Sequence, residues 1–237
     1  MNPPSDAGLQ AGYVVDDVAS ASLTAARDWD WVTAELTMAR GQAYVLQHIL
    51  RNRFFSAVMR PAWMSRCPDQ AIVRKTIAQM SEELVYDPAI KAAHTKILWQ
   101  MGRNLGLTDE QMNSVEPETE TAASFSILEN LARDWHWTVG WMGSSIDEFV
   151  LVQLPEHNFR PERWKEALGL TDEQVFFFDY HLTADLEHAG KKVWEPMRRH
   201  LTPEIEVEIR RSLPLLLESA RLFYAGVERH AQRLTAG

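Results

Sequence analysis

Helical periodicity over nearly the whole chain is the feature that most constrains its fold. No run of alternating β-branched residues extends beyond a few positions, as strands would require. The eleven Gly and eleven Pro residues cluster where helices are expected to end. We therefore predict an all-α fold, with helices near residues 14–27, 30–58, 69–84, 89–105, 121–153, 172–195 and 203–234.

The heptapeptide LGLTDEQ occurs twice, at residues 105–111 and 168–174. In each copy the glycine is suited to close one helix, and the threonine followed three residues later by glutamine is suited to cap the next. Nothing else recurs with the two copies, so the repeat indicates shared capping chemistry and not a solenoid.

A single domain is expected from the length and composition. The 237 residues are 46% hydrophobic, which is enough for one sizeable core, and no Gly/Ser linker or block of charge divides them. We expect one helical domain over residues 1–237, with residues 1–12 flexible. The formal charge of −9 and the lack of a Lys/Arg run indicate that nucleic acid is not a partner.

The compartment is expected to be the cytoplasm. Cys67 is the only cysteine, which excludes an intramolecular disulfide and suits a reducing environment. The first twenty residues lack the basic and apolar regions of a signal peptide, and no stretch approaches 18 uninterrupted apolar residues. We therefore expect neither export nor a membrane partner.

The stretch HLTADLEHAG at residues 181–190 places His181, Asp185 and His188 on one helical face. Residues spaced i, i+4 and i+7 fall within roughly 60° of one another on a helix. An apolar stripe runs beside them, formed by Leu182, Leu186, Ala189 and Val193. The three side chains are thus expected to face the interior, where imidazole and carboxylate suit iron, manganese or zinc.

Further ligands must come from other helices. His94 lies beside an apolar stripe in AIKAAHTKIL, and Glu148 lies in SSIDEFVLVQL near the end of the long helix predicted over 121–153. Trp137 and Trp141 precede Glu148 by 11 and 7 residues, which would put them on nearly the same face. An acid preceding His94 would complete a set of six.

These residues resemble the heme-oxygenase-like diiron oxidases and oxygenases. The resemblance is carried by His181, Asp185 and His188 in the pattern H-x3-D-x2-H, by a glutamate about thirty residues upstream, and by an acid and a histidine before that. It covers roughly residues 40–200 and includes the phrases RCPDQAIVR and TDEQ. It implies a single-domain bundle of about seven helices and a non-heme centre that activates dioxygen. Relatives oxidatively decarboxylate, fragment or N-oxygenate fatty acids and amino acids.

The resemblance implies two Fe²⁺ ions per chain, bound by Glu83, His94, Glu148, His181, Asp185 and His188. The first acid stays open, because Glu82 and Asp87 are alternatives to Glu83. Asp87 could instead cap a helix that begins at Pro88. A different alignment, counted back from Pro155, places the ligand that corresponds to Glu148 near Leu151, which cannot coordinate a metal.

Charge favours two metal ions over one. Three carboxylates contribute −3, which is costly in an apolar core, whereas two divalent ions contribute +4 and stabilise the ionised acids. Iron and manganese both accept this ligand set, so the sequence does not choose between them.

The expected function is that of an iron-dependent oxidoreductase that uses dioxygen to oxidise a small carboxylate-bearing substrate, an amino acid more than a long fatty acid. Trp137 and Trp141 are candidate substrate-binding residues, with space left by Gly140 and Gly143. Lys192, eleven residues after His181, is a candidate for binding the carboxylate. An external electron donor and a homodimer are further expectations.

Two other functions are alternatives on the same fold: a thiaminase II-like hydrolase and a metal-free binding protein. Thiaminase II and pyrroloquinoline quinone synthase share the fold without the diiron site. A thiaminase II-like hydrolase would need Cys67 as nucleophile, and the connection SRCPDQ is an unsuitable place for one. A metal-free binding protein would use the histidines as packed polar residues.

Overall fold

The computed structural model describes residues 13–154, 157–188 and 194–236, with the side chains of residues 13, 147–148, 151–152 and 183–188 left undescribed. The predicted all-α class is confirmed: these residues form helices and no strand, with one isolated bridge between Asp87 and Ala92. The flexibility predicted for residues 1–12 lies outside the described residues.

The described helices follow one another along the chain with short connections. They are α1 (Tyr13–Ala26), α2 (Met38–Phe54), the π-helix η1 (Phe55–Met59), α3 (Arg60–Met64), α4 (Gln70–Leu84), α5 (His94–Asn104), α6 (Asp109–Ser114), α7 (Thr119–Asp134), α8 (Trp137–Gly143), α9 (Ile146–Gln153), α10 (Pro161–Leu168), α11 (Phe176–His188), the 3₁₀-helix η2 (Glu195–His200) and α13 (Pro203–Ala236).

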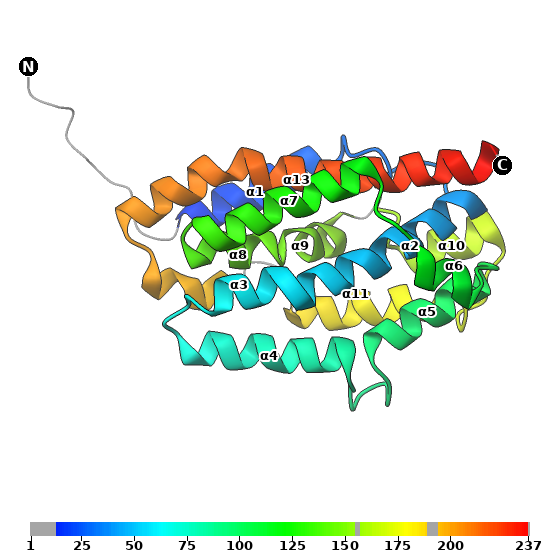
Figure 1. Cartoon of the computed structure of the whole chain (residues 1–237), viewed down its shortest axis with the longest axis horizontal. Helices are drawn as coiled ribbons and strands as arrows, with labels where there is room; N and C mark the ends of the chain where they lie inside the picture. The colour runs from blue at the N-terminus through cyan, green and yellow to red at the C-terminus, as the bar shows by residue number, and fades with distance from the viewer. Residues whose placement is uncertain (1–12, 155–156, 189–193, 237) are drawn as a thin grey trace, which may run out of the picture.

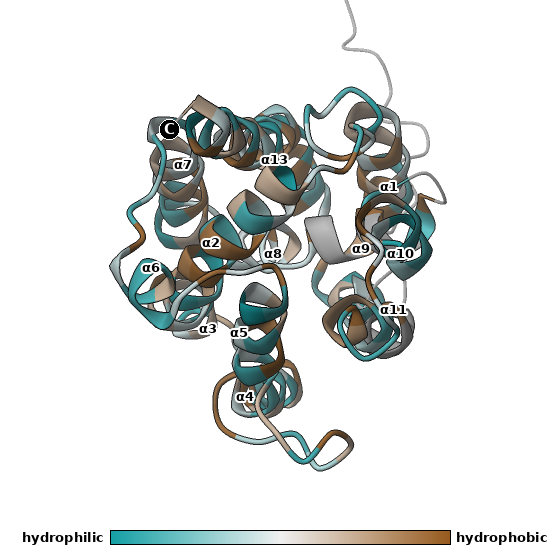
Figure 2. Ribbon diagram, turned by 90° about the vertical axis from the view of Figure 1, so that its right-hand side faces the viewer, coloured by the Kyte–Doolittle hydropathy of each residue, from teal (hydrophilic) through white to brown (hydrophobic). Residues whose placement is uncertain are grey.

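Helices α2, α7 and α13 form the spine of the molecule (Figure 1). The long helix α13 packs along α7 and α2, and α8 packs against α7 and α3. Helix α5 contacts α2, α4 and α11, so it joins the spine to the lower layer. The end-on view shows α4 beyond α5, projecting away from the main bundle (Figure 2).

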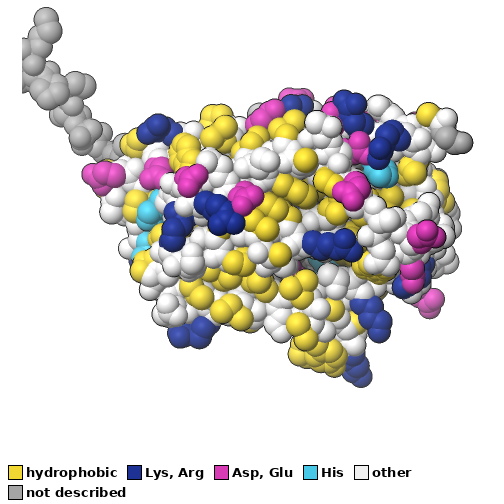
Figure 3. Space-filling model, in the orientation of Figure 1, with side chains coloured by type: hydrophobic (Ala, Val, Ile, Leu, Met, Phe, Trp, Pro, Cys, Tyr) yellow, Lys and Arg dark blue, Asp and Glu magenta, His cyan; other side chains and the backbone are white. Residues whose placement is uncertain are grey.

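The turn after α4 carries exposed apolar side chains. Figure 3 shows hydrophobic side chains gathered along the lower edge of one face of the molecule. Leu84, Val85 and Tyr86 are 44%, 72% and 50% exposed. Such a patch suits contact with another protein surface, and the expected homodimer stays a prediction. None of the described helices has the length and apolar character needed to cross a lipid bilayer.

The helix predicted over 30–58 begins later than predicted. Thr37 caps α2 by accepting a hydrogen bond from the Arg40 amide. The preceding segment turns because buried Asn158 donates its side-chain amide to the carbonyls of Trp31 and Ala34, at 2.6 and 3.0 Å. These bonds satisfy the backbone without a helix. At its other end α2 continues through the π-helix η1 into α3.

The single helix predicted over 121–153 is wrong, because the chain breaks there twice. His136 caps α8 by accepting from the Thr138 amide. The hydroxyls of Ser144 and Ser145 then donate to the Trp141 carbonyl, at 2.7 and 3.1 Å, where α8 ends. Side chains of this kind compete with helical hydrogen bonds. Helical spacing therefore does not place Trp141 on the face of Glu148.

The capping predicted for the two LGLTDEQ copies is confirmed. Gly106 and Gly169 adopt left-handed φ angles of 84° and 67°. Thr108 and Gln111 form a complete capping box at the start of α6. In the second copy Thr171 and Gln174 exchange the same pair of bonds, and α11 begins at Phe176.

Gly140 is packed too closely against its neighbours to accommodate a side chain. A Cβ atom at this position would lie 2.6 Å from Trp63 Cβ and 3.1 Å from Ala132 Cα, between α8 and its neighbours α3 and α7. We expect Gly140→Ala to lower the free energy of unfolding by about 1–3 kcal/mol, because overpacking outweighs the better helix propensity of alanine. Urea denaturation would measure the loss. Ser126→Ala on the exposed face of α7 is the control, and equal stability of the two variants would contradict the prediction.

Candidate metal centre

Two of the predicted histidine ligands, distant in sequence, converge between α5 and α11. His94 is the first residue of α5 and His181 lies in α11, and their ring centroids are 5.0 Å apart. The carboxylate of Glu83 is close enough to influence both rings electrostatically. The side chains of Glu148, Asp185 and His188, and the whole of Lys192, lie outside the described residues.

Asp87 lies in direct contact with the histidine pair. Its Oδ2 accepts a hydrogen bond from His94 Nε2 at 2.8 Å and another from the Tyr180 hydroxyl, while Oδ1 accepts from the Ala89 amide at 2.8 Å. Burial acts to raise the pKa of Asp87, but these hydrogen bonds outweigh it and lower the pKa. Because α5 begins at His94, Asp87 is not the cap of a helix beginning at Pro88.

Glu83 is held by an arginine. Both of its oxygens accept from Arg60, at 2.5 and 2.9 Å, and Gln79 donates to one of them at 3.2 Å. Burial opposes ionisation of Glu83, but the charge and hydrogen bonds of Arg60 overcome it and lower the pKa of Glu83. Glu82, the third alternative, is half-buried next to Glu83. Of the three candidate acids, Asp87 is the one that contacts His94 directly.

Each histidine has one ring nitrogen engaged by a protein oxygen and the other directed elsewhere. His181 Nδ1 lies 2.7 Å from the Phe177 carbonyl, which can only accept, so Nδ1 carries the proton and Nε2 the lone pair. His94 bonds the Asp87 carboxylate through Nε2, so Nδ1 is the ring nitrogen that a metal ion would use. Burial, reinforced by the nearby charge of His94, lowers the pKa of His181 to about 4. His181 is therefore neutral at pH 7, as coordination requires.

These donors fit an iron site. Imidazoles whose second nitrogen bonds a carboxylate or carbonyl are typical of metal ligands, and carboxylates with lowered pKa values are ionised at neutral pH. Within the part of the chain that the structure describes, no three acid, histidine or cysteine side chains are grouped closely enough to hold a metal ion. A complete site therefore needs ligands from the remainder, where three of the predicted ligands lie.

Sequence reasoning missed three residues around this centre. His48 Nδ1 in α2 is hydrogen-bonded to the Tyr44 hydroxyl at 2.7 Å, and Tyr180 donates to Asp87. Burial, with the charges of Arg51 and His181, lowers the pKa of His48 well below its ordinary value. The i, i+4 spacing of Tyr44 and His48 within an apolar helix was the signal that could have identified this pair.

Trp137 and Trp141 pack in the core. Their rings are 6.0 Å apart and stacked, and Trp141 also stacks on Trp63. Gly140 and Gly143 do not leave the predicted space, because a Cβ at either position would meet Trp63 or Met59 within 2.8 Å. Binding of substrate by the two tryptophans stays a prediction.

Cys67 is unsuited to act as a nucleophile. The side chain is buried, and its thiol donates to the Asp69 carbonyl at 3.7 Å. Burial raises the pKa of the thiol, so it is protonated at neutral pH. This does not favour a hydrolase that depends on a cysteine thiolate.

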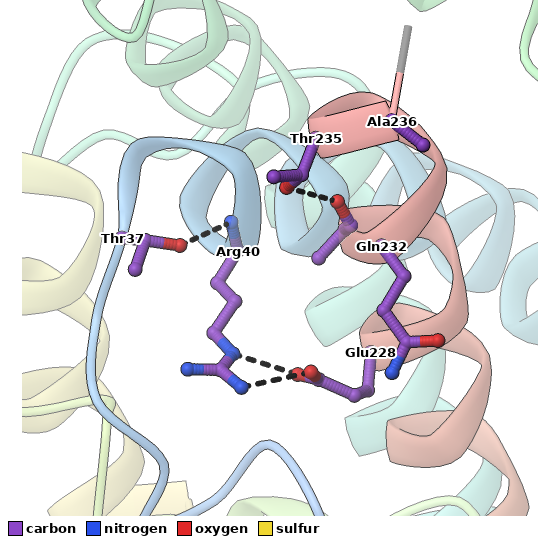
Figure 4. Close-up of a pocket in the computed structure, with 7 residues that line it drawn as sticks. Thr37, Arg40, Glu228, Gln232, Thr235 and Ala236 are labelled. Atoms are coloured by element: carbon purple, nitrogen blue, oxygen red, sulfur yellow. Dashed lines mark hydrogen bonds and ion pairs between the residues drawn. The ribbon is translucent and has the colours of Figure 1, made fainter.

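A separate pocket of about 430 Å³ opens between α2 and α13 (Figure 4). Arg40 and Glu228 face each other across it and form an ion pair at 2.7 Å, and Thr37 caps α2 beside them. None of the predicted metal ligands lines this pocket. The pocket is therefore separate from the candidate metal centre.

The fold and the histidine pair together define a class of helical proteins. A domain of unknown function with a heme oxygenase-like fold, from Shewanella denitrificans OS217, matches with a TM-score of 0.73 over 97% of this chain and 96% of its own, at 14% sequence identity. This similarity shows that the chain has a heme oxygenase-like fold. Residues 42–215 match the family described as iron-containing redox enzymes, and the chain belongs to that family. No curated protein matches the chain.

The lowered pKa of His181 predicts a pH dependence of stability in metal-free protein. The unfolded chain protonates this histidine near pH 6.5 and the folded chain near pH 4, so the unfolded state binds more protons within this window. The free energy of unfolding should fall as the pH drops from 6.5 to 4, with up to about 3 kcal/mol from His181. Urea denaturation of wild type and His181→Gln across this range would measure it. A variant with an unchanged pH slope would contradict the assignment.

Proposed function

We propose that the chain is a non-heme diiron oxygenase or oxidase that uses dioxygen to oxidise a small carboxylate-bearing substrate. Membership of the iron-containing redox enzyme family supports the general class. The observation that carries the finer proposal is the approach of His94 and His181, each held through one ring nitrogen by a protein oxygen and with the ionised Asp87 beside them. Bound iron would supply the redox capacity to activate dioxygen.

In this proposal His94, His181 and Asp87 hold metal together with Glu148, Asp185 and His188. Asp87 replaces Glu83 as the favoured first acid, because Asp87 contacts His94 directly whereas Glu83 forms an ion pair with Arg60. The last three ligands rest on the sequence pattern and the family resemblance. Helices α9, with Glu148, and α11, with Asp185 and His188, would thus supply the other half of the site.

The remaining described residues have defined tasks around these ligands. The Phe177 carbonyl sets the tautomer of His181, and the Asp87 carboxylate sets that of His94. Tyr180 donates its phenolic proton to Asp87 and so orients that carboxylate. Outer contacts of this kind hold ligands in the geometry that the metal needs.

The charge around the centre suits a substrate with a carboxylate. Arg51 and Arg60 are 5% and 2% exposed on α2 and α3. Arg51 acts on His48, and Arg60 is paired with Glu83. A buried cation such as Arg51 attracts an anionic group that enters the interior. This supports a carboxylate-bearing substrate, and the preference for an amino acid over a long fatty acid rests on the sequence alone.

Metal loading of matched variants tests the ligand assignment. Wild-type protein loaded with ferrous iron without dioxygen should bind about two iron ions per chain. His181→Ala and Asp87→Asn should lose most of this iron because each removes a donor. Glu83→Gln should keep it, with lower stability, because Arg60 loses its charged partner. Asp109→Asn, an exposed carboxylate paired with Arg103, is the control.

Iron retained by Asp87→Asn and lost by Glu83→Gln would restore Glu83 as the ligand. Wild-type protein that binds no iron under reducing, iron-replete conditions would overturn the diiron proposal and favour a metal-free protein. For the substrate, iron-loaded protein should be exposed to dioxygen with a panel of amino acids and fatty acids. A visible absorption that one amino acid triggers would support the proposal, and oxygen consumption unaffected by every compound would contradict it.

A further inference from the structure

A continuous row of tryptophan, tyrosine and histidine rings crosses the core beside the candidate metal centre. Trp29 stacks on Tyr224 with centroids 5.5 Å apart, Tyr224 on Trp31 at 5.8 Å, and Trp31 on Tyr44 at 4.5 Å. Tyr44 is hydrogen-bonded to His48 at 2.7 Å. We call these five residues the aromatic path.

The inner end of the aromatic path reaches His181 across one ring. The Phe177 centroid lies 5.7 Å from that of His48 and 4.2 Å from that of His181. The path and Phe177 come from three separate parts of the sequence: the turn before α2 together with α2, helix α11, and helix α13. These parts meet around the spine (Figure 1). Tertiary packing has therefore brought redox-active side chains into one row.

Composition and spacing of the row suit single-electron transfer. Tryptophan and tyrosine are the aromatic side chains that one-electron oxidants attack most readily. Electron tunnelling weakens steeply with distance, so several short steps are faster than one long step. The stacked rings of Trp31, Tyr44 and Tyr224, all 0% exposed, provide such steps in a part of the core without water contact.

The contact between Tyr44 and His48 supplies what oxidation of a buried tyrosine needs. A phenol that loses an electron becomes a strong acid and must pass its proton to a neighbouring base. His48 Nδ1 lies 2.7 Å from the Tyr44 hydroxyl, within hydrogen-bond distance, so it is placed to receive that proton. Burial and the charge of Arg51 keep the pKa of His48 low, so the imidazole is neutral beforehand and returns the proton readily.

We propose that the aromatic path carries single electrons between the protein surface near Trp29 and the candidate iron centre, with His48 as the proton acceptor for Tyr44. The inference rests on the proposed function, because it takes the iron centre as the inner electron acceptor. Trp29 is buried but lies between the exposed residues Asp28 and Asp30, so the outer end of the path is close to solvent.

Each residue that gives up an electron receives one electron in return. Tyr44 gives one electron inward and its phenolic proton to His48, which leaves a neutral tyrosyl radical and an imidazolium. Trp31 then returns one electron to Tyr44, and His48 returns the proton. Trp29 gives one electron to Trp31 by tunnelling through the stacked ring of Tyr224, which keeps its proton and is not itself oxidised. A one-electron reductant in solution, for which ascorbate is the probe, then returns one electron to Trp29.

Flash oxidation of metal-free protein tests the path without iron. Tris(bipyridine)ruthenium(III), generated by a laser flash, is a cationic one-electron oxidant that Asp28 and Asp30 attract. The protein should carry Tyr86→Phe, because Tyr86 is 50% exposed and would react directly with the oxidant. It should also carry Tyr13→Phe, so that Tyr13 contributes no radical signal. We expect a tyrosyl radical in electron paramagnetic resonance spectra, with most of the signal lost in Tyr44→Phe and in Trp31→Phe.

Trp164→Phe is the matched control for Trp31→Phe. Both tryptophans are fully buried, and each donates its indole N–H to a backbone carbonyl, Trp31 to Arg40 and Trp164 to Asn158. Trp164→Phe should keep the radical. Equal radical yields in the two variants, or a full yield in Tyr44→Phe, would overturn the path. Tyr44→Phe removes a single hydroxyl, so it keeps the test decisive if Trp31→Phe does not fold.

Exposure of iron-loaded protein to dioxygen without substrate tests the connection to the centre. Freeze-quenched samples should show a radical that depends on Tyr44, and ascorbate should remove it faster in Trp164→Phe than in Trp31→Phe. If the flash-generated radical depends on Tyr44 and Trp31 but the protein binds no iron, the proposed function is overturned and the aromatic path is retained. Iron binding with no radical dependent on Tyr44 would overturn the connection.

Discussion

The Asp87 carboxylate is the contact on which the candidate centre depends. It accepts hydrogen bonds from His94 at the start of α5, from Tyr180 on α11 and from the amide of Ala89 in its own turn. One buried acid thereby links two helices and the connection that precedes α5. Because a buried carboxylate is stable only when donors surround it, the turn and both helices are held to one arrangement.

Electrostatic balance explains how so many ionisable groups lie together. Glu83 is neutralised by Arg60, and Asp87 is stabilised by three donors. Burial keeps His181 and His48 neutral, with pKa values below the ordinary range. The described half of the centre thus carries ionised acids and neutral imidazoles at pH 7, which is the protonation state that divalent metal ions bind.

The aromatic core has a structural and a chemical aspect. Trp31 fills the space between Tyr44 and Tyr224, and buried Asn158 holds the segment that carries it. That segment is the one where helical periodicity predicted a helix and the structure shows a turn. Stacking of large rings between α2 and α13 stabilises the bundle, and the same stacking sets the short ring separations that electron transfer needs.

The sequence by itself determined the features that depend on neighbours along the chain. Helical class, the glycine stops at 106 and 169, the threonine–glutamine caps and the presence of His94 and His181 in helices all follow from contacts within a few residues. Local patterns also predicted one helix over 121–153, where His136, Ser144 and Ser145 end helices instead.

Only the tertiary structure decided which acid contacts His94, because the partners that separate Asp87 from Glu83 come from other segments of the chain. Arg60 from α3 takes Glu83, and Tyr180 from α11 joins Asp87. The pairing of Tyr44 with Trp31 and Tyr224 was equally invisible in the sequence, since it joins segments far apart in the chain. Contacts of this kind arise when helices pack, and no local propensity encodes them.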